Sequence, residues 1–224
     1  LGDVYKRQVV NNYPYYDAAT RGVNFSGMLD TLNSIPSGSI VLLHACCHNP
    51  TGADLSDAQW AQVIEVVLKR GLIPFLDMAY QGFGDGIESD GKVVRQFAEA
   101  GGPVFVSNSF SKSFSLYGER VGALSIVAVS AEEAARVLSQ LKRVIRTNYS
   151  NPPIHGGQVV ATALATPELR ALWEQELADM RVRIRDMRQA FVQKLKEQAP
   201  AHNFDFVIQP VSYTHLTLPT TPYV

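Results

Sequence analysis

The residues best suited to chemistry are a lysine and an aspartate at the ends of short apolar stretches. Lys112 follows Ser109-Phe110-Ser111, where partial desolvation would favour a neutral amine able to attack an aldehyde. Asp77 follows Phe75-Leu76. A carboxylate there is costly unless it meets a cation, such as a protonated ring nitrogen. Each residue also has an ordinary interpretation, as a solvated surface lysine and as a turn cap.

Two further polar groups could serve the same ring. Tyr80 lies three residues after Asp77, and Asn49 opens the segment Asn49-Pro50-Thr51-Gly52. A hydroxyl and an amide could both donate hydrogen bonds to a phenolic oxygen and stabilise its anionic form. The same four-residue segment is also an ordinary turn sequence, so only the combination of groups points to a ligand.

Two serines next to Lys112 and two arginines further along the chain could bind an anion. Arg120 has the planar guanidinium that suits bidentate phosphate binding, and the hydroxyls of Ser109 and Ser111 are further donors. Because Arg120 follows Glu119, it could instead form a surface ion pair. Arg146 closes a predicted helix, where it could simply complement the helix dipole.

These groups follow stretches that we expect to be buried strands. Four short apolar runs have this character: 39–45, 71–76, 103–107 and 122–128. Between the first two, residues 54–70 have apolar side chains at helical spacing. This order predicts crossover connections and an α/β fold with a mostly parallel sheet flanked by helices. Ligands collect at the carboxyl ends of such strands, where the polar motifs begin.

Two further helices are predicted downstream. Residues 131–145 have a helical pattern, and Thr166-Pro167-Glu168 is a helix start with a capping hydroxyl and a proline at the first position. From there, apolar residues recur every three or four positions for about eight turns. We therefore expect one long amphipathic helix that links two domains.

The composition limits the function classes. The chain has 224 residues, 46% of them hydrophobic, which suits a soluble globular protein. Its net charge of -1 favours neither nucleic acid nor an anionic membrane as a partner. The two cysteines are adjacent and unsuited to an ordinary disulfide, and no apolar run approaches the roughly 20 residues that span a bilayer. We therefore expect a cytoplasmic protein that acts on small molecules.

Four motifs resemble one enzyme family. They are His44-Ala-Cys-Cys-His-Asn-Pro-Thr-Gly52, Asp77-Met-Ala-Tyr-Gln-Gly-Phe83, Ser109-Phe-Ser-Lys-Ser-Phe-Ser-Leu-Tyr-Gly-Glu-Arg-Val-Gly122 and Asn148-Tyr-Ser-Asn-Pro-Pro153. In order and spacing they look like the class I, fold-type I aminotransferases that depend on pyridoxal phosphate, the aspartate and aromatic enzymes. The likeness runs from about Val9 to Gln209. The segment around Lys112 is more similar to the bacterial aromatic (tyrosine) branch.

The resemblance implies a role for each residue. Lys112 would form the Schiff base with pyridoxal phosphate and shuttle the proton. Asp77 would pair with the pyridine nitrogen, with His44 as its support, and Asn49 and Tyr80 would bind the ring oxygen. The phosphate would be bound by Ser109, Ser111 and Arg120. The substrate would be bound by Asn49 and Arg146. Arg146 would reach the site of a neighbouring subunit, which implies a homodimer. The substrates would be an aromatic or dicarboxylic L-amino acid and 2-oxoglutarate.

The resemblance also divides the chain. We expect residues 9–165 to be part of the cofactor-binding large domain and residues 166–209 to be a long helix that begins a mostly missing small domain. Residues 1–8 and 210–224 look foreign to the rest, and we expect a non-native leader and tail. Because the family has further phosphate- and carboxylate-binding segments on both sides, the chain could be a truncated, inactive fragment.

Two other interpretations remain to be compared. A different fold-type I enzyme, such as a β-lyase or decarboxylase, would use the same lysine and aspartate. His44, Cys46, Cys47 and His48 could suggest a metal centre. Zinc sites, however, pair ligands two to five residues apart with a second pair far along the chain, and no second cysteine pair exists. We therefore expect no metal.

Overall fold

The computed structural model describes residues 9–208, so the predicted leader (1–8) and tail (210–224) lie outside the described residues. The strands are β1 (Tyr16–Asp17), β2 (Gly22–Val23), β3 (Ile40–His44), β4 (Ile73–Met78), β5 (Val104–Ser109) and β6 (Gly122–Val127). The helices are α2 (Phe25–Ser34), α3 (Asp57–Arg70), α4 (Ile87–Asp90), α5 (Lys92–Glu99), α6 (Ala131–Asn148), α7 (His155–Ala165), α8 (Pro167–Gln198) and the 3-10 helix η1 (Asp205–Ile208).

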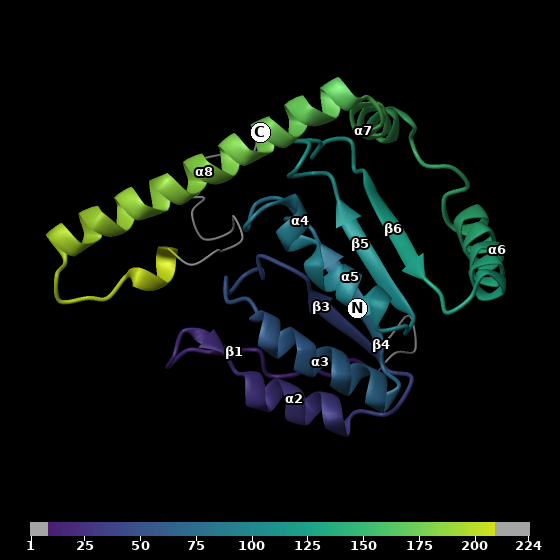
Figure 1. The fold of residues 1–224 in the computed structure, drawn as a ribbon, viewed down its shortest axis with the longest axis horizontal. Coiled ribbons are helices and arrows are strands. Elements are labelled where there is room, and N and C mark those ends of the chain that lie inside the picture. Colours follow the sequence, from purple (N-terminus) through teal and green to yellow (C-terminus); the bar gives the residue numbers. More distant parts are fainter. Residues whose placement is uncertain (1–8, 209–224) are drawn as a thin grey trace.

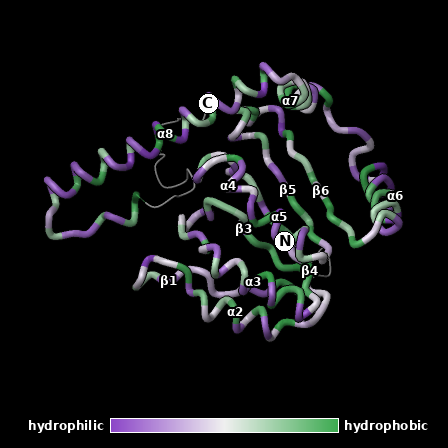
Figure 2. Tube along the Cα trace, in the orientation of Figure 1, coloured by the Kyte–Doolittle hydropathy of each residue, from purple (hydrophilic) through white to green (hydrophobic). Residues whose placement is uncertain are grey.

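A four-stranded sheet forms the centre of the fold, in the order β3-β4-β5-β6 (Figure 1). β3, β4 and β5 are parallel, whereas β6 runs antiparallel to β5. Helices connect the parallel strands, as such connections require. The predicted α/β fold with a mostly parallel sheet is therefore confirmed, with one antiparallel strand. The hydropathy view shows hydrophobic residues along the strands and mixed residues along α8 (Figure 2).

The two faces of the sheet are covered differently. Along β4, Pro74, Leu76 and Met78 are buried, while the alternate residues, which include Asp77, are only partly buried. Because successive side chains of a strand point to opposite faces, Asp77 points away from the buried core. On β3, Leu42 is 52% exposed. The face that presents Asp77 is therefore the more open one in residues 9–208.

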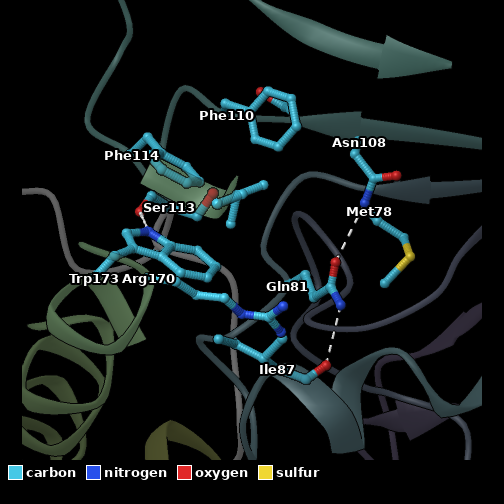
Figure 3. A pocket seen from close by; sticks show the side chains of 11 residues that line it. Met78, Gln81, Ile87, Asn108, Phe110, Ser113, Phe114, Arg170 and Trp173 are labelled. Atoms are coloured by element: carbon cyan, nitrogen blue, oxygen red, sulfur yellow. Dashed lines mark hydrogen bonds between the residues drawn. The ribbon is translucent and has the colours of Figure 1, made fainter. Parts of the chain in front are cut away.

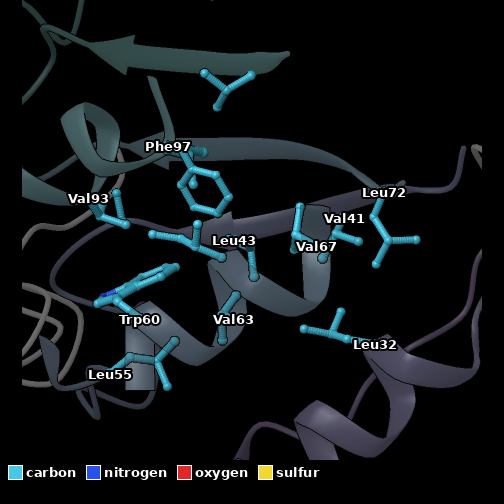
Figure 4. Close-up of a cluster of buried hydrophobic side chains, with 14 of the residues drawn as sticks. Leu32, Val41, Leu43, Leu55, Trp60, Val63, Val67, Leu72, Val93 and Phe97 are labelled. Atoms are coloured by element: carbon cyan, nitrogen blue, oxygen red, sulfur yellow. The ribbon is translucent and has the colours of Figure 1, made fainter. Parts of the chain in front are cut away.

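The covered face packs against α2, α3 and α5 (Figure 4). The buried cluster draws on these helices and on β3, β4 and β5, and it includes Met28, Leu32, Val41, Leu43, Trp60, Val63, Val67, Leu76, Val93, Phe97, Val104 and Val106. The rings of Trp60 and Phe97 meet edge to face, with their centroids 6.4 Å apart. Burying one such side chain stabilises the folded state by about 1.5–3 kcal/mol. The whole cluster therefore holds β3, β4 and β5 firmly on the helices.

Helix α3 begins later than the pattern predicts. Ser56 caps it, because the Ser56 hydroxyl accepts from Gln59 N and the Gln59 side chain accepts from Ser56 N. Gly71 ends it in the left-handed conformation, with φ of 61°. Asp54 is thereby left in the loop before the helix, where its carboxylate is free to bind loop backbone.

Helix α8 has 32 residues and confirms the predicted long helix with proline at its start. The predicted capping hydroxyl is wrong, because the Thr166 side chain makes no cap hydrogen bond. Pro167 lacks an N–H, so the first turn has one donor fewer to satisfy. Leu177 is fully buried, while Leu172 is 56% exposed. Among the helices of residues 9–208, none is long and apolar enough to cross a membrane.

Candidate functional site

Lys112 lies in the connection between β5 and β6. Ser109 pairs with Gly122 at the start of this connection, and Phe110 N donates to the Val121 carbonyl at 3.2 Å. Inside it, Phe114 N donates to the Phe110 carbonyl at 3.2 Å, and Ser115 N to the Lys112 carbonyl at 3.1 Å. These bonds hold Lys112 in a closed turn at the carboxyl end of the parallel strands.

The structure brings Lys112 and Tyr80 together. The Lys112 Nζ atom lies 4.6 Å from the centroid of the Tyr80 ring. Tyr80 is buried, with 6% exposure, and Lys112 is half-buried. A cation over an aromatic face is stabilised by the ring quadrupole. The ring therefore stabilises the amine at this place, and the Lys112 side chain keeps part of its surface exposed.

Asp77 and His44 are neighbours across β3 and β4. They are register partners, so their side chains leave the same face of the sheet. Asn49 N donates to His44 Nδ1 at 3.2 Å. Because Nδ1 accepts here, the ring proton belongs on Nε2. His44 thus connects the end of β3 to the loop that presents Asn49, beside Asp77.

Asp54 organises the loop that contains Asn49. Its two carboxylate oxygens accept from Cys47 N and His48 N, both at 2.7 Å. Burial raises the pKa of Asp54. His48 stacks on Tyr15, with ring centroids 3.9 Å apart. Burial first, and His44 second, lower the pKa of His48 to about 4. The loop therefore has a carboxylate on its backbone and a neutral imidazole beside the sheet.

Ser109, Ser111 and Arg120 flank the same β5–β6 junction. Ser109 Oγ accepts from Ser111 N at 3.3 Å, and Ser111 is 7% exposed. Arg120 has φ of 52°, is exposed, and donates from Nη1 to the Tyr117 carbonyl at 3.1 Å. Arg120 thus has a strained backbone conformation, and its guanidinium bonds within its own turn.

Helix α7 packs against this junction. His155 Nδ1 lies 3.0 Å from Glu119 Oε2, the residue before Arg120. A side chain at Gly156 would come within 2.8 Å of Glu119 Cβ, so glycine permits the close approach. The first turn of α7 therefore holds the segment that presents Arg120.

Arg146 lies apart from the predicted residues around Lys112. It lies in the last turn of α6, on the far side of β6 from β3 and β4 (Figure 1). Its side chain is exposed and donates from Nη1 to Ser150 Oγ at 2.6 Å. Within one chain, Arg146 is therefore not part of the cluster around Lys112.

Asp90 holds the loop that follows Tyr80, and sequence reasoning missed it. Its carboxylate is 8% exposed and accepts from Gly82 N at 2.8 Å, Gly84 N at 3.0 Å and Asp85 N at 2.9 Å. This loop directly follows Tyr80. The glycine-rich segment from Gly82 to Gly86 was the available signal, because its several N–H groups need an acceptor.

A cavity of about 240 Å³ opens beside the turn of Lys112 (Figure 3). Its walls come from the ends of β4 and β5, from the following turn and from α7 and α8, and they include Met78, Gln81, Asn108, Ser109, Phe110, Ser113, Phe114, Leu164, Arg170 and Trp173. Gln81 Oε1 accepts from Asn108 Nδ2 at 3.3 Å in its wall. Ser109 and Ser113 face this cavity, while Lys112 does not line it.

Cys46 and Cys47 lie just after β3. Both are buried free thiols. A side-chain hydrogen bond with Cys47, followed by burial, raises the pKa of Cys46. Between residues 9 and 208, no group of three or more His, Cys, Asp or Glu side chains is arranged to hold a metal ion.

Curated relatives of the chain are aminotransferases. It is 64% identical to the aspartate aminotransferase of Pseudomonas aeruginosa over 198 residues, which is 88% of this chain and 50% of that protein. It is 55% identical to the aromatic-amino-acid aminotransferase of Escherichia coli K12 over 211 residues, which is 93% of this chain and 53% of that protein. The chain therefore spans about half the length of these relatives.

A solved structure and a family model agree with this. The crystal structure of aromatic-amino-acid aminotransferase from Burkholderia pseudomallei, covalently bound to pyridoxal phosphate, superposes with a TM-score of 0.88 at 66% identity. The match covers 89% of this chain and 50% of that chain. The family model "Aminotransferase class I and II" matches residues 4–220. The chain therefore belongs to the class I and II aminotransferase family.

Proposed function

We propose that this chain is the cofactor-binding part of an aminotransferase that holds pyridoxal phosphate on Lys112. The reaction would move the α-amino group of an aromatic or dicarboxylic L-amino acid to 2-oxoglutarate. The observation that supports this best is the Lys112 amine, 4.6 Å from the Tyr80 ring and close to the strand ends that present Asp77 and Asn49. Family membership and the cofactor named for the Burkholderia enzyme add support.

The donor set suits each part of this cofactor. Lys112 would hold the aldehyde carbon, and the Asp77 carboxylate would face the pyridine nitrogen, with His44 supporting it. Asn49 and Tyr80 would donate to the ring oxygen. Ser109, Ser111 and Arg120 would bind the phosphate, for which Arg120 supplies a charged, planar donor. When bound, the protonated ring supplies an electron sink for the substrate α-carbon.

Lys112 would also move the proton. With an amino-acid substrate in the site, the Lys112 Nζ atom would take the proton from the substrate α-carbon and hold it for return. The Tyr80 ring would limit how far the amine moves. Asn49 would also contact the substrate.

Arg146 would act in the site of a partner subunit. Its guanidinium is exposed at the end of α6, where it could bind the distal carboxylate of a dicarboxylic substrate. This role requires a homodimer.

We further propose residues 9–165 as part of the large domain and 166–209 as the start of a small domain. Two free cysteines are compatible with a reducing cytoplasm.

Trapping of the cofactor on one lysine tests the proposal. Pyridoxal phosphate is added to the 224-residue chain, reduced with borohydride and located by mass spectrometry. We expect the label on Lys112, its loss in Lys112→Ala, and no change in Lys142→Ala, an exposed lysine of α6. Label spread evenly over the surface lysines would contradict the proposal.

A second candidate function is cofactor binding without turnover. It would apply to these 224 residues taken alone, which match about half the length of the relatives. Incubation with tyrosine or aspartate and 2-oxoglutarate separates the two. Glutamate formation supports transamination, while a labelled Lys112 without glutamate supports a binding fragment. A different product from the amino acid would indicate another fold-type I reaction.

A further inference from the structure

Trp173 of α8 contacts the turn that contains Lys112 in two ways. Its indole Nε1 donates to the Ser113 carbonyl at 2.7 Å, one residue after Lys112 (Figure 3). Its ring also stacks on Phe114, with centroids 4.6 Å apart and an interplanar angle of 15°. Phe114 in turn meets Phe110 edge to face at 5.6 Å. Aromatic contacts therefore span both sides of Lys112.

The same helix contacts the loop after Tyr80. Arg181 Nη1 donates to the Gly82 carbonyl at 2.8 Å. The fully buried Leu177 packs so closely on Gly82 that a side chain at Gly82 would collide with it. Residues 173, 177 and 181 are four apart and therefore lie on one side of the helix. We call these three residues the α8 contact face.

The α8 contact face thus joins two segments that meet at the candidate site. Trp173 holds the turn of Lys112, and Leu177 and Arg181 hold the loop of Tyr80. Lys112 Nζ and the Tyr80 ring meet at 4.6 Å. A rigid helix that contacts both segments sets the distance between them, because its own residues cannot shift relative to one another.

We infer that Trp173 is a positioning residue for Lys112. By its hydrogen bond to Ser113 and its stacking on Phe114, it holds the amine over Tyr80, where the cofactor aldehyde must arrive. The importance of this position for catalysis rests on the proposed function. The geometric part can be tested without the cofactor.

The test measures how fast acetic anhydride acylates Lys112 in the cofactor-free chain at several pH values, by mass spectrometry. In the parent chain, we expect Lys112 to react more slowly than the exposed Lys142. Trp173→Phe keeps an aromatic ring but loses the donor. Because one hydrogen bond changes a local equilibrium about fivefold, we expect Lys112 to react about fivefold faster in this variant. Leu172→Ala, at a 56% exposed position of the same helix, should change nothing.

A second variant and a second measurement keep the test decisive. Phe114→Leu removes the stacking partner and keeps the indole donor, so it should also speed acylation of Lys112. Amide hydrogen exchange should accelerate at Ser115 and not in β3. If both variants leave the acylation rate within twofold of the parent, or if exchange at Ser115 changes while the reactivity of Lys112 does not, the positioning role is wrong.

Cofactor trapping distinguishes this inference from the proposed function. If the parent chain takes no pyridoxal phosphate on Lys112, the proposed function fails, while the acylation rates still decide the role of Trp173. If the parent chain is labelled and Trp173→Phe behaves identically in trapping and acylation, only the positioning role fails. We expect Trp173→Phe to need about fivefold more cofactor for half-labelling.

Discussion

At the scale of single residues, His48 is a side chain whose charged form the fold disfavours. Burial, and the neighbouring His44, lower its pKa to about 4, against about 6.5 for an unperturbed histidine. The ring stacks on Tyr15, and its Nδ1 lies 2.8 Å from Thr51 Oγ1. Its neutral form therefore belongs to the native loop that presents Asn49.

This predicts a pH dependence of folding stability. Between pH 6.5 and about 4, the unfolded chain binds a proton at His48 that the folded chain does not. The contribution of neutral His48 to folding stability is therefore complete above pH 6.5 and decreases as the pH falls towards 4. Because the ring is partly open to solvent, we expect a loss of about 1–2 kcal/mol. Urea unfolding at several pH values measures it, and an equally steep decrease in His48→Gln would contradict it.

Tyr80 allows a second prediction at this scale. Tyr80→Phe keeps the ring beneath the Lys112 amine and removes only the hydroxyl that would bind the cofactor ring oxygen. We expect cofactor affinity to fall about fivefold, the usual effect of one hydrogen bond. An absorbance titration with pyridoxal phosphate measures the change. Folding stability should stay the same, and unchanged affinity would remove Tyr80 from the ring-oxygen site.

At the scale of elements, two loops follow strand ends, and each is fixed by a carboxylate that binds its backbone N–H groups. Asp54 binds two N–H groups before Asn49, and Asp90 binds three after Tyr80. A carboxylate offers about four acceptor positions, so it can hold several backbone donors that the strands leave unpaired. Each of these loops is thus ordered without regular secondary structure of its own.

Removing the charge at Asp90 tests whether this carboxylate holds the loop after Tyr80. Asp90→Asn keeps the shape but leaves one oxygen acceptor for three N–H groups, so at least one buried donor loses its partner. We expect a loss of about 1–3 kcal/mol in the free energy of unfolding and faster amide exchange at Gly82 and Gly84. Urea denaturation and exchange measurements check both. Asp85→Asn, at an exposed position of the same loop, is the matched control and should be neutral.

Most of the elements could be predicted from local patterns, and some could not. The four sheet strands were found within two or three residues, because each is a short apolar run bounded by turn residues. Helices α2, α5 and α7 were not predicted. α5 has eight residues, and α7 begins His155-Gly156-Gly157, so neither offers a long apolar period. The direction of β6 was also not predictable, since an apolar run is the same in both directions.

At the scale of the whole molecule, α8 joins distant parts of the chain. It contacts the β5–β6 turn through Trp173 and the loop after β4 through Arg181, across 60 and 99 residues of sequence. Leu177 lies between these contacts and is fully buried, whereas Leu172 is 56% exposed. The helix therefore contributes to stability through a few positions on one side.

Truncation of these two leucines should have different effects. Leu177→Ala creates a cavity at Gly82, so we expect it to lower the free energy of unfolding by about 2–5 kcal/mol. Leu172→Ala should change it by less than about 0.5 kcal/mol. Urea unfolding followed by far-UV circular dichroism measures both. Equal effects would mean that α8 is not packed on the Tyr80 loop in solution.

The sequence alone determined the chemical groups and where strands would present them: an amine at Lys112, a carboxylate at Asp77, donors at Asn49 and Tyr80, and a guanidinium at Arg120. Side-chain chemistry and the period of apolar residues are local properties, so they can be recognised along the chain. Only the tertiary structure decided that Lys112 lies over Tyr80, and that α8 spans both segments. Such contacts depend on how segments far apart in sequence pack around a common core, which no local pattern records.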